Sequence, residues 1–289
     1  MTMVIDGQVW VITGAHGMLG RDLVEVTAEN GARAVGIDRA DADITDLASL
    51  EAAVPECDVI VNCAAYTAVD QAESDEDVAR AINGVGAGNV AAVAATRGAR
   101  LVHISTDYVF SGDASEPYAE GAARAPLSAY GRTKAAGEEA VEASGSDALI
   151  VRTAWLYGAH GNCFPKTIAK AGAERGVLAV VDDQIGQPTW THDLAGFIVR
   201  LIEADAPAGI YHGTSSGSAS WFEFAQAVVS SARLGDIVAA TTSSAFTRPA
   251  PRPAWSVLGH DSAVRAGVAP IGHWRERWDA AAKTVLRDS

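Results

Sequence analysis

The chain has 289 residues, of which 48% are hydrophobic and 20% charged, so it can bury a large core and intrinsic disorder is excluded. Its 36 Asp and Glu residues outnumber 22 Lys and Arg, and the net charge of −14 argues against a broad nucleic-acid-binding face. The N-terminal residues lack the pattern of a signal peptide and no apolar run is long enough to span a membrane, so we expect a cytoplasmic protein that binds neither nucleic acid nor membrane.

Short apolar runs alternate with helical patterns through the first half of the chain. We expect strands at residues 8–14, 32–38, 58–64, 99–106 and 147–153. We expect helices at residues 18–31, 45–54, about 75–97 and around Tyr130. Thr45 is the expected N-cap of the second helix. This alternation predicts an α/β fold with a parallel, doubly wound sheet of the Rossmann type, covered on both faces.

After about residue 155 the pattern loosens. A strand and loop are expected over 176–190, and helices over 192–205, 220–234 and 273–288. Ser220 and Glu223 have capping-box spacing, whereas the Pro-rich residues 247–256 exclude a regular helix. We expect a dinucleotide-binding Rossmann domain and a smaller C-terminal substrate-binding lobe. Their expected extents are 1–155 with parts of 177–212 for the first, and about 156–176 with 213–289 for the second.

A glycine-rich loop joins the first expected strand to the first helix. Gly14, Gly17 and Gly20 would allow a tight turn and a close approach of the backbone to a pyrophosphate. Asp38, at the end of the second strand, is suited to bind an adenosine ribose. Arg39 follows it and is suited to the additional phosphate of NADP. The loop therefore predicts a dinucleotide cofactor, and the choice between NADH and NADPH stays open.

A second group of residues carries the expected chemistry. Tyr130 and Lys134 share one helix face, and Thr106 ends the fourth strand at the edge where ligands bind in such sheets. A lysine ammonium beside the phenol would lower the tyrosine pKa, so that Tyr130 could exchange a proton with a substrate oxygen. The tyrosine–lysine spacing alone is commonplace, but together with the glycine loop and Thr106 it indicates a catalytic pair.

This joint pattern resembles the extended short-chain dehydrogenase/reductase superfamily. The segments "VNCAAYTAVDQAESD", "HISTDYVFSG", "RTAWLYGAHGNCFPKTI", "VVDDQIGQPTWTHDLA" and "RPAPRPAWSVL" are similar to those of dTDP-4-dehydrorhamnose reductases, and the resemblance covers residues 9 to about 279. It implies that NADPH or NADH reduces the C4 ketone of a nucleotide-sugar substrate, dTDP-4-dehydro-L-rhamnose, to dTDP-L-rhamnose.

The resemblance also implies roles for individual residues. Tyr130 would be the proton donor, Lys134 would bind the nicotinamide ribose and Thr106 would complete the catalytic triad. The other expected cofactor contacts are Gly14, His16, Gly17, Met18, Leu19, Asp38, Arg39, Asp43, Ile44, Ala64, Ala65, Tyr66, Thr67 and Asn83. The expected substrate contacts are Thr106, Tyr130, Val69, Asp107, Tyr108 and Trp155. His16, Met18 and Tyr66 depart from residues common in the family, but contacts made through the backbone would survive these changes.

Two arginines lie in the Pro-rich segment of this acidic chain. Because guanidinium groups suit phosphates, we expect Arg248 or Arg252 to bind the diphosphate of the substrate. The aromatic residues Trp221, Phe222, Phe224, Trp274 and Trp278 have helical spacing, which favours packing over ligand stacking.

Some relatives are magnesium-dependent dimers. No carboxylate spacing here demands a metal, so none is expected, and a homodimer stays an open alternative. The three cysteines also lack metal-ligand spacing and favour a reduced protein. Two other functions remain as alternatives. One is another epimerase or dehydratase of the superfamily, and the other is a non-catalytic NADP-binding regulatory subunit.

Overall fold

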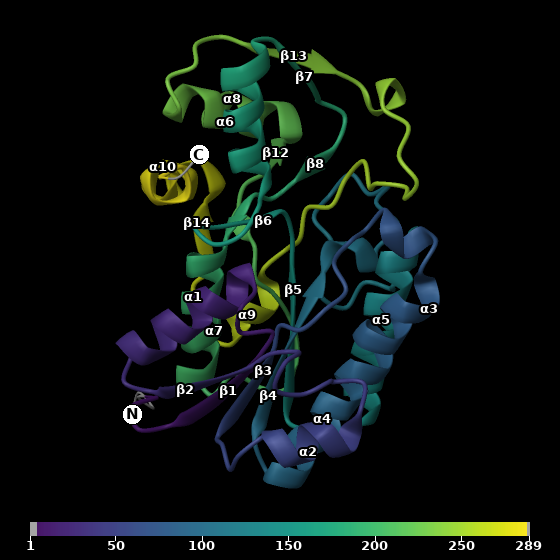
Figure 1. Ribbon diagram of the computed structural model, residues 1–289, viewed down its shortest axis with the longest axis vertical. Coiled ribbons are helices and arrows are strands. Elements are labelled where there is room, and N and C mark those ends of the chain that lie inside the picture. Colours follow the sequence, from purple (N-terminus) through teal and green to yellow (C-terminus); the bar gives the residue numbers. More distant parts are fainter. Residues whose placement is uncertain (1–4, 288–289) are drawn as a thin grey trace.

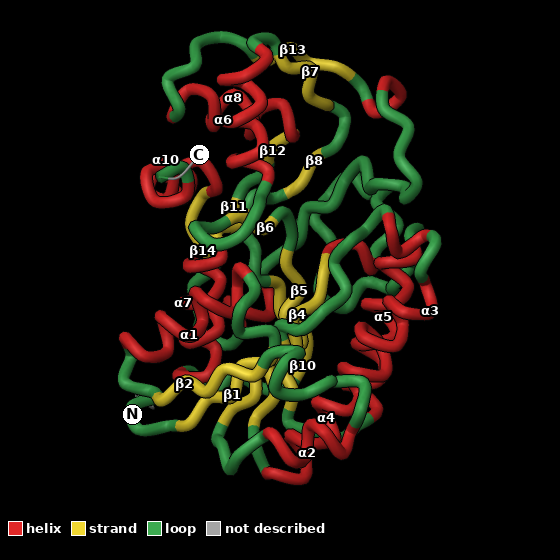
Figure 2. The backbone as a smooth tube through the Cα atoms, in the orientation of Figure 1, coloured by secondary structure: helices red, strands yellow, loops and turns green. Residues whose placement is uncertain are grey.

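The structure is a computed structural model that describes residues 5–287. A six-stranded parallel sheet forms its larger lobe, in the order β10-β5-β4-β3-β1-β2 (Figures 1 and 2). The strands are β1 (Val9–Thr13), β2 (Arg33–Ile37), β3 (Val59–Asn62), β4 (Arg100–Thr106), β5 (Ala148–Thr153) and β10 (Gly209–His212). The predicted doubly wound fold is confirmed. We did not predict β10, a four-residue edge strand that pairs only with β5 in this sheet and is too short to give a clear apolar run.

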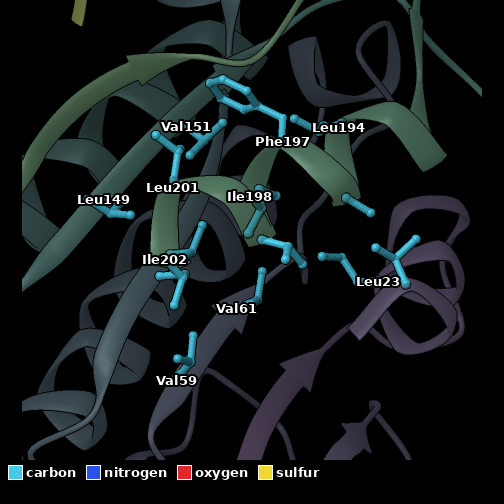
Figure 3. Close-up of a cluster of buried hydrophobic side chains, with 14 of the residues drawn as sticks. Leu23, Val59, Val61, Leu149, Val151, Leu194, Phe197, Ile198, Leu201 and Ile202 are labelled. Atoms are coloured by element: carbon cyan, nitrogen blue, oxygen red, sulfur yellow. The ribbon is translucent and has the colours of Figure 1, made fainter. Parts of the chain in front are cut away.

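Helices cover both faces of the sheet, as the sequence predicted (Figure 1). On one face, α1 (Met18–Glu29) packs against α7 (Thr191–Glu203), and α9 (Asp261–Arg265) lies beside β10. The other face carries α2 (Leu47–Ala53), α3 (Glu76–Arg80), α4 (Ala87–Arg97) and α5 (Ala129–Ala143). The core under α7 is apolar (Figure 3), with side chains that include Leu23, Val59, Val61, Leu149, Val151, Leu194, Phe197, Ile198, Leu201 and Ile202.

Two helix details differ from the prediction. Asp46, not Thr45, caps α2, because its carboxylate accepts hydrogen bonds from the backbone of Ala48 and Ser49, whereas Thr45 is bound to Asp43 in the preceding turn. The long helix expected near residues 75–97 is present, but a π-helical turn, η2 (Ala81–Gly86), separates α3 from α4. Such turns are frequent at functional sites.

The smaller lobe contains α6 (Phe164–Arg175), α8 (Trp221–Ser231) and α10 (Trp274–Val285). Its short strands pair as β6 (Leu156–Tyr157) with β9 (Thr189–Trp190), β7 (Leu178–Val181) with β13 (Val238–Thr241), β8 (Ile185–Gly186) with β12 (Ala219–Ser220), and β11 (Ser215–Ser216) with β14 (Ile271–His273). Single 3₁₀ turns occur at η1 (Gln71–Glu73), η3 (Asp107–Val109) and η4 (Ser243–Ala245).

Several predictions for this lobe are confirmed. Ser220 and Glu223 form a capping box, and residues 247–256 form no regular helix. The aromatic side chains pack together in the core, with Trp278 and Phe224 fully buried. The last helix was expected over 273–288, but it spans Trp274–Val285 and is followed by a turn; residue 288 lies outside the described residues.

The chain crosses between the lobes more than once. Ala263, Val268 and Ile271 follow most of the smaller lobe in sequence, yet they pack in the core of the larger one with α7. The domain boundaries expected from the sequence therefore stay a prediction. Within residues 5–287, no helix is long and apolar enough to cross a membrane.

Candidate active site

A cavity of about 1080 Å³ lies at the carboxyl ends of the parallel strands. Parallel sheets of this kind bind ligands at this edge, and the volume exceeds what one drug-sized ligand needs. Its wall includes these expected residues: Gly14, Gly17, Met18, Leu19, Asp38, Arg39, Asp43, Ile44, Ala64, Ala65, Thr67, Val69, Thr106, Asp107, Tyr108, Tyr130, Lys134 and Trp155. Five expected residues of the described chain lie outside the wall: His16, Tyr66, Asn83, Arg248 and Arg252.

The wall also contains residues that we did not predict. Cys63, Ser105 and Thr153 lie at or directly after the ends of β3, β4 and β5, and Val78 comes from α3. Position at a strand end was a signal that could have found the first three, because these ends converge on the ligand edge. Nothing in the local pattern marked Val78, which reaches the wall from a helix.

The glycine loop is shaped by close backbone contacts. Gly14 has φ of +68°, and a Cβ there would lie 2.9 Å from the backbone nitrogen of Ala64. A Cβ on Gly20 would lie 2.8 Å from the Cα of Ala15. Gly17 precedes α1 without any side-chain cap, so the first N–H groups of the helix are free of a competing side chain. These features fit a pyrophosphate at the helix N-terminus.

Asp38 and Arg39 lie at the expected adenosine end of the cavity. The Asp38 carboxylate accepts hydrogen bonds from the backbone N–H of His16 at 2.6 Å and of Arg39 at 3.1 Å. The His16 imidazole lies 3.2 Å from the same carboxylate and is itself 77% exposed. Arg39 is exposed and forms no ion pair with another described residue. A carboxylate and a free guanidinium thus stand side by side, which keeps both forms of the cofactor open.

Thr106 ends β4, while Tyr130 and Lys134 lie on the first turns of α5, which Ser128 caps. Glycines bring this helix close to its neighbours, since a Cβ on Gly131 would collide with the carbonyl of Tyr108. The Lys134 ammonium is 2% exposed and donates a hydrogen bond to the Ile104 carbonyl at 2.6 Å. Burial lowers the pKa of Lys134 to about 8.

The expectation that Lys134 lowers the pKa of Tyr130 is wrong for this structure. Burial raises the pKa of Tyr130 to about 12, an interaction with Thr106 opposes the rise, and the charge of Asp107 adds to it. Desolvation is the largest influence on this pKa, and the Lys134 ammonium, which donates to the Ile104 carbonyl, does not offset it. The phenol therefore stays protonated throughout the neutral range.

A buried ion pair lies behind the triad. Glu138, one helical turn after Lys134, is fully buried and its carboxylate accepts two hydrogen bonds from Arg152 of β5, at 2.7 and 2.8 Å. Ser105 and Arg124 each donate to the same carboxylate at 2.6 Å. Burial alone would raise the pKa of Glu138, but Arg152, Ser105 and Arg124 lower it to about 2. These contacts tie α5 to β4 and β5.

Aromatic side chains form the other end of the cavity. Trp155 has φ of +47°, which is rare for a residue with a side chain, and its indole stacks on Trp221 with ring centroids 3.6 Å apart. A Cβ on Gly186 would lie 2.7 Å from the Trp155 indole nitrogen, so this glycine makes room for the indole. Tyr108 meets Tyr130 edge-on, with centroids 5.6 Å apart.

Asn83 is buried outside the cavity wall, in the π-helical turn. Its amide oxygen accepts from the backbone N–H of Tyr66 at 2.8 Å, and its amide nitrogen donates to the Tyr66 carbonyl and to Thr133. The amide therefore bonds between elements rather than within its own helix. It fixes the loop that contains Ala65 and Thr67, both in the wall.

Arg252 and Arg248 lie beside the carboxylate of Asp70 and do not line the cavity. Arg252 binds Asp70 through both guanidinium nitrogens, at 2.7 and 2.8 Å, and donates to the Ala250 carbonyl. Arg248 lies 3.9 Å from Asp70 and is 59% exposed. The structure therefore does not bring either arginine into the wall.

One group of side chains could hold a metal ion. Ligand atoms of Asp22, Glu25 and His160 lie within 4.8 Å of one another, and none of the three residues lines the cavity. Burial raises the pKa of Asp22. Sequence spacing could not show this group, because His160 is distant along the chain from α1.

Comparison with known proteins agrees with this geometry. The family model for the RmlD substrate binding domain matches residues 9–287. The chain is 47% identical over 277 residues to a dTDP-4-keto-6-deoxy-D-glucose reductase of Streptomyces niveus, covering 92% of this chain and 93% of the relative. It is 45% identical over 278 residues to a dTDP-4-dehydrorhamnose reductase of Streptomyces griseus, covering 92% and 90%.

Solved structures are similar over nearly the same extent. A Bacillus anthracis dTDP-4-dehydrorhamnose reductase in complex with NADP superimposes with a TM-score of 0.92 and 40% identity, covering 95% of this chain and 98% of that one. The likeness therefore extends over nearly the whole chain, both lobes included.

Proposed function

The chain belongs to the RmlD family, and from this premise we propose that it reduces the C4 ketone of dTDP-4-dehydro-L-rhamnose to dTDP-L-rhamnose. It is an NAD(P)H-dependent reductase of dTDP-linked sugars. The observation that carries the proposal is a single cavity in which the glycine loop and the three residues Thr106, Tyr130 and Lys134 meet.

A reduced nicotinamide cofactor, when bound, supplies the hydride for the ketone carbon. Gly14, Gly17 and the free N–H groups of α1 would hold its pyrophosphate, and Asp38 would hold its adenosine ribose. The cavity wall fits this group, because the loop has glycines, and therefore no side chains, where its backbone would approach the pyrophosphate. The buried ammonium of Lys134 would bind the ribose nearer the nicotinamide.

Tyr130 would give its phenolic proton to the ketone oxygen. A pKa of about 12 keeps this proton in place until negative charge develops on the substrate oxygen. Lys134, whose pKa is about 8, is charged at neutral pH, and its ammonium, which donates to the Ile104 carbonyl, would act on the cofactor ribose rather than on the phenol. The phenol is therefore protonated before the reaction begins, as proton donation to the ketone oxygen requires.

Val69, Asp107, Tyr108 and Trp155 would surround the sugar, because all four line the same cavity. For the diphosphate, Arg248 is more available than Arg252, because it lies 3.9 Å from Asp70 and is 59% exposed, whereas Arg252 is bonded to Asp70 at 2.7 Å. A second substrate class also deserves a test. The 47% identity to the Streptomyces niveus enzyme favours a dTDP-4-keto-6-deoxy-D-glucose substrate as the alternative.

Absorbance of the reduced nicotinamide tests the proposal directly. Purified protein would be mixed with NADPH or NADH and with each of the two 4-keto sugars, and the products would be separated by chromatography. We expect oxidation of the cofactor and formation of dTDP-L-rhamnose, with Tyr130→Phe as the inactive control. Protein that binds NADPH but oxidises none of it with either sugar would contradict the proposal and favour a regulatory subunit.

The assembly and location form a further part of the proposal. We propose a homodimer on the resemblance to dimeric relatives, to be checked by light scattering with and without Mg²⁺. We also propose a cytoplasmic location, supported by free thiols at Cys57, Cys63 and Cys163. Fractionation of the source cells checks this location.

A further inference from the structure

Thr106 has one hydroxyl proton, and its neighbours compete for it. Its Oγ1 lies 2.9 Å from Oδ1 of Asp107 and accepts a hydrogen bond from the backbone N–H of Tyr108 at 3.2 Å. An ionised carboxylate has no proton to donate, so Thr106 must be the donor in its contact with Asp107. While Asp107 is ionised, the Thr106 proton is therefore directed away from any substrate oxygen in the cavity.

Asp107 is an unusual partner because it is buried and incompletely bonded. The residue is 2% exposed, and no other residue among 5–287 satisfies its Oδ2 with hydrogen-bond geometry. The buried hydroxyl of Ser256, from the Pro-rich segment, also lacks a partner within those residues and faces this carboxyl closely enough to lower its pKa. An ionised oxygen in this position is costly, and a proton on the carboxyl removes the cost.

The surroundings of Asp107 shift its titration toward neutral pH. Burial raises the pKa of Asp107 to about 6, although Ser256 and Thr106 oppose the rise. The titratable groups that face it are the phenols of Tyr108, on the same turn, and Tyr130, on α5, and burial raises the pKa of both. The guanidinium of Arg252, in the Pro-rich segment, acts on the neighbouring Tyr108 and is paired with Asp70.

Resting on the reduction proposed above, we propose that Asp107 is a positioning residue whose proton decides whether Thr106 can donate a hydrogen bond to the substrate's C4 oxygen. When Asp107 binds a proton, it either donates to Oγ1 of Thr106 or remains an uncharged acceptor. A neutral acceptor holds a hydroxyl proton about half as strongly as a carboxylate does. In both cases Thr106 can turn its O–H toward the ketone oxygen.

The proposed role of Asp107 adds no bond-making or bond-breaking step to the reduction. The ketone carbon gains hydride, its oxygen gains the proton of Tyr130, and Thr106 keeps its own proton throughout. Thr106 adds a second hydrogen-bond donor as negative charge develops on the oxygen. Loss of one such donor lowers turnover by about 10²–10³ in enzymes that stabilise an oxyanion, so the effect is large enough to measure.

The pH profile of kcat tests the switch. Initial rates with NADPH and with 4-deuterated NADPH, between pH 5 and 9, identify the range in which hydride transfer limits the rate. We expect kcat of the wild type to rise about tenfold or more as pH falls through the Asp107 transition. Asp107→Asn should lack this transition, and its kcat at pH 8 should exceed that of the wild type.

Ser256→Ala is the sharper variant, because Ser256 contacts neither cofactor nor substrate in the proposal. Loss of its hydroxyl removes an interaction that lowers the pKa of Asp107, so the transition should move to higher pH. Asp113→Asn, an exposed aspartate nearby in the chain, is the matched control and should leave the profile unchanged. An unshifted profile in Ser256→Ala, or a wild-type profile in Asp107→Asn, would overturn the inference.

A carboxyl titration separates this inference from the proposed reaction. ¹³C NMR of the Asp107 carboxyl in the protein without ligands should show a midpoint near 6, and a higher one in Ser256→Ala. A midpoint at the ordinary aspartate value would overturn the switch even in an active enzyme. Inactivity of the wild type on both sugars at every pH would instead overturn the proposed function, while the NMR titration still decides the state of Asp107.

Discussion

Replacement of Glu138 by glutamine should destabilise the protein strongly at neutral pH. The side chain keeps its shape, but the buried guanidinium of Arg152, which is 1% exposed, loses its negative partner. Removal of one member of a buried pair leaves an uncompensated charge and typically costs about 3–5 kcal/mol. The pKa of Glu138 gives a similar figure, because a decrease from 4.5 to about 2 corresponds to about 3 kcal/mol.

The sign of the pH dependence follows from the same decrease. A carboxyl with a lowered folded-state pKa stabilises fully above its unfolded value of 4.5, and this contribution disappears as pH falls toward 2. The difference in unfolding free energy between wild type and Glu138→Gln should therefore be about 3 kcal/mol at pH 7 and shrink steadily below pH 4.5. Activity should suffer too, because the negative charge of Glu138 raises the pKa of Lys134.

Urea denaturation, followed by tryptophan fluorescence at pH 7 and at pH 3.5, measures both differences. Asp279→Asn provides the control, since its pair with Arg275 at 3.4 Å is half exposed and surface pairs contribute little. The reasoning would be refuted if Glu138→Gln unfolded within about 1 kcal/mol of the wild type at pH 7, well below the range for a broken buried pair. A difference equal at both pH values would refute the assigned electrostatic origin.

Three further predictions test the site. Tyr130→Phe should lower kcat at least about a hundredfold while the Kd for NADPH changes little, and wild-type turnover would argue against proton donation by this phenol. Gly20→Ala should raise the Kd for NADPH, because the new Cβ would lie 2.8 Å from the Cα of Ala15, and calorimetry that finds unchanged affinity would contradict the tight loop. Arg248→Ala should raise the KM for the sugar nucleotide more than Arg252→Ala does, since only Arg252 is held by two hydrogen bonds to Asp70, and steady-state kinetics with equal KM values would count against this order.

Local patterns in the sequence were enough to predict the frame of the site. Strands β1 to β5 and the glycine loop are determined by residues adjacent in sequence. Apolar runs therefore identify the strands, and the glycines identify the turn. Thr106, Tyr130 and Lys134 converge because strand ends and the following helix meet at one edge of any such sheet.

Features that depend on distant partners could not be predicted in this way. Glu138 reads in sequence as an ordinary helix-surface acid, and only the arrival of Arg152 from β5 makes it a buried one. Asp70 and Arg252 are 182 positions apart in the chain but form a hydrogen bond, so this arginine is paired with a carboxylate instead of the expected substrate diphosphate. The pKa of Tyr130 is raised rather than lowered, because it depends mainly on burial, and burial is a property of the assembled site.

The return of residues 263–271 to the larger lobe also bears on how the protein is made. Ala263, Val268 and Ile271 complete a core that begins with the first strands, so this core stays open until nearly the whole chain has left the ribosome. Contacts between the two ends of a chain close slowly, because a long loop must be ordered first. The cofactor-binding half therefore cannot finish folding as an N-terminal fragment during synthesis, and a stop codon near residue 260 would leave an exposed apolar surface for chaperones and proteases to recognise.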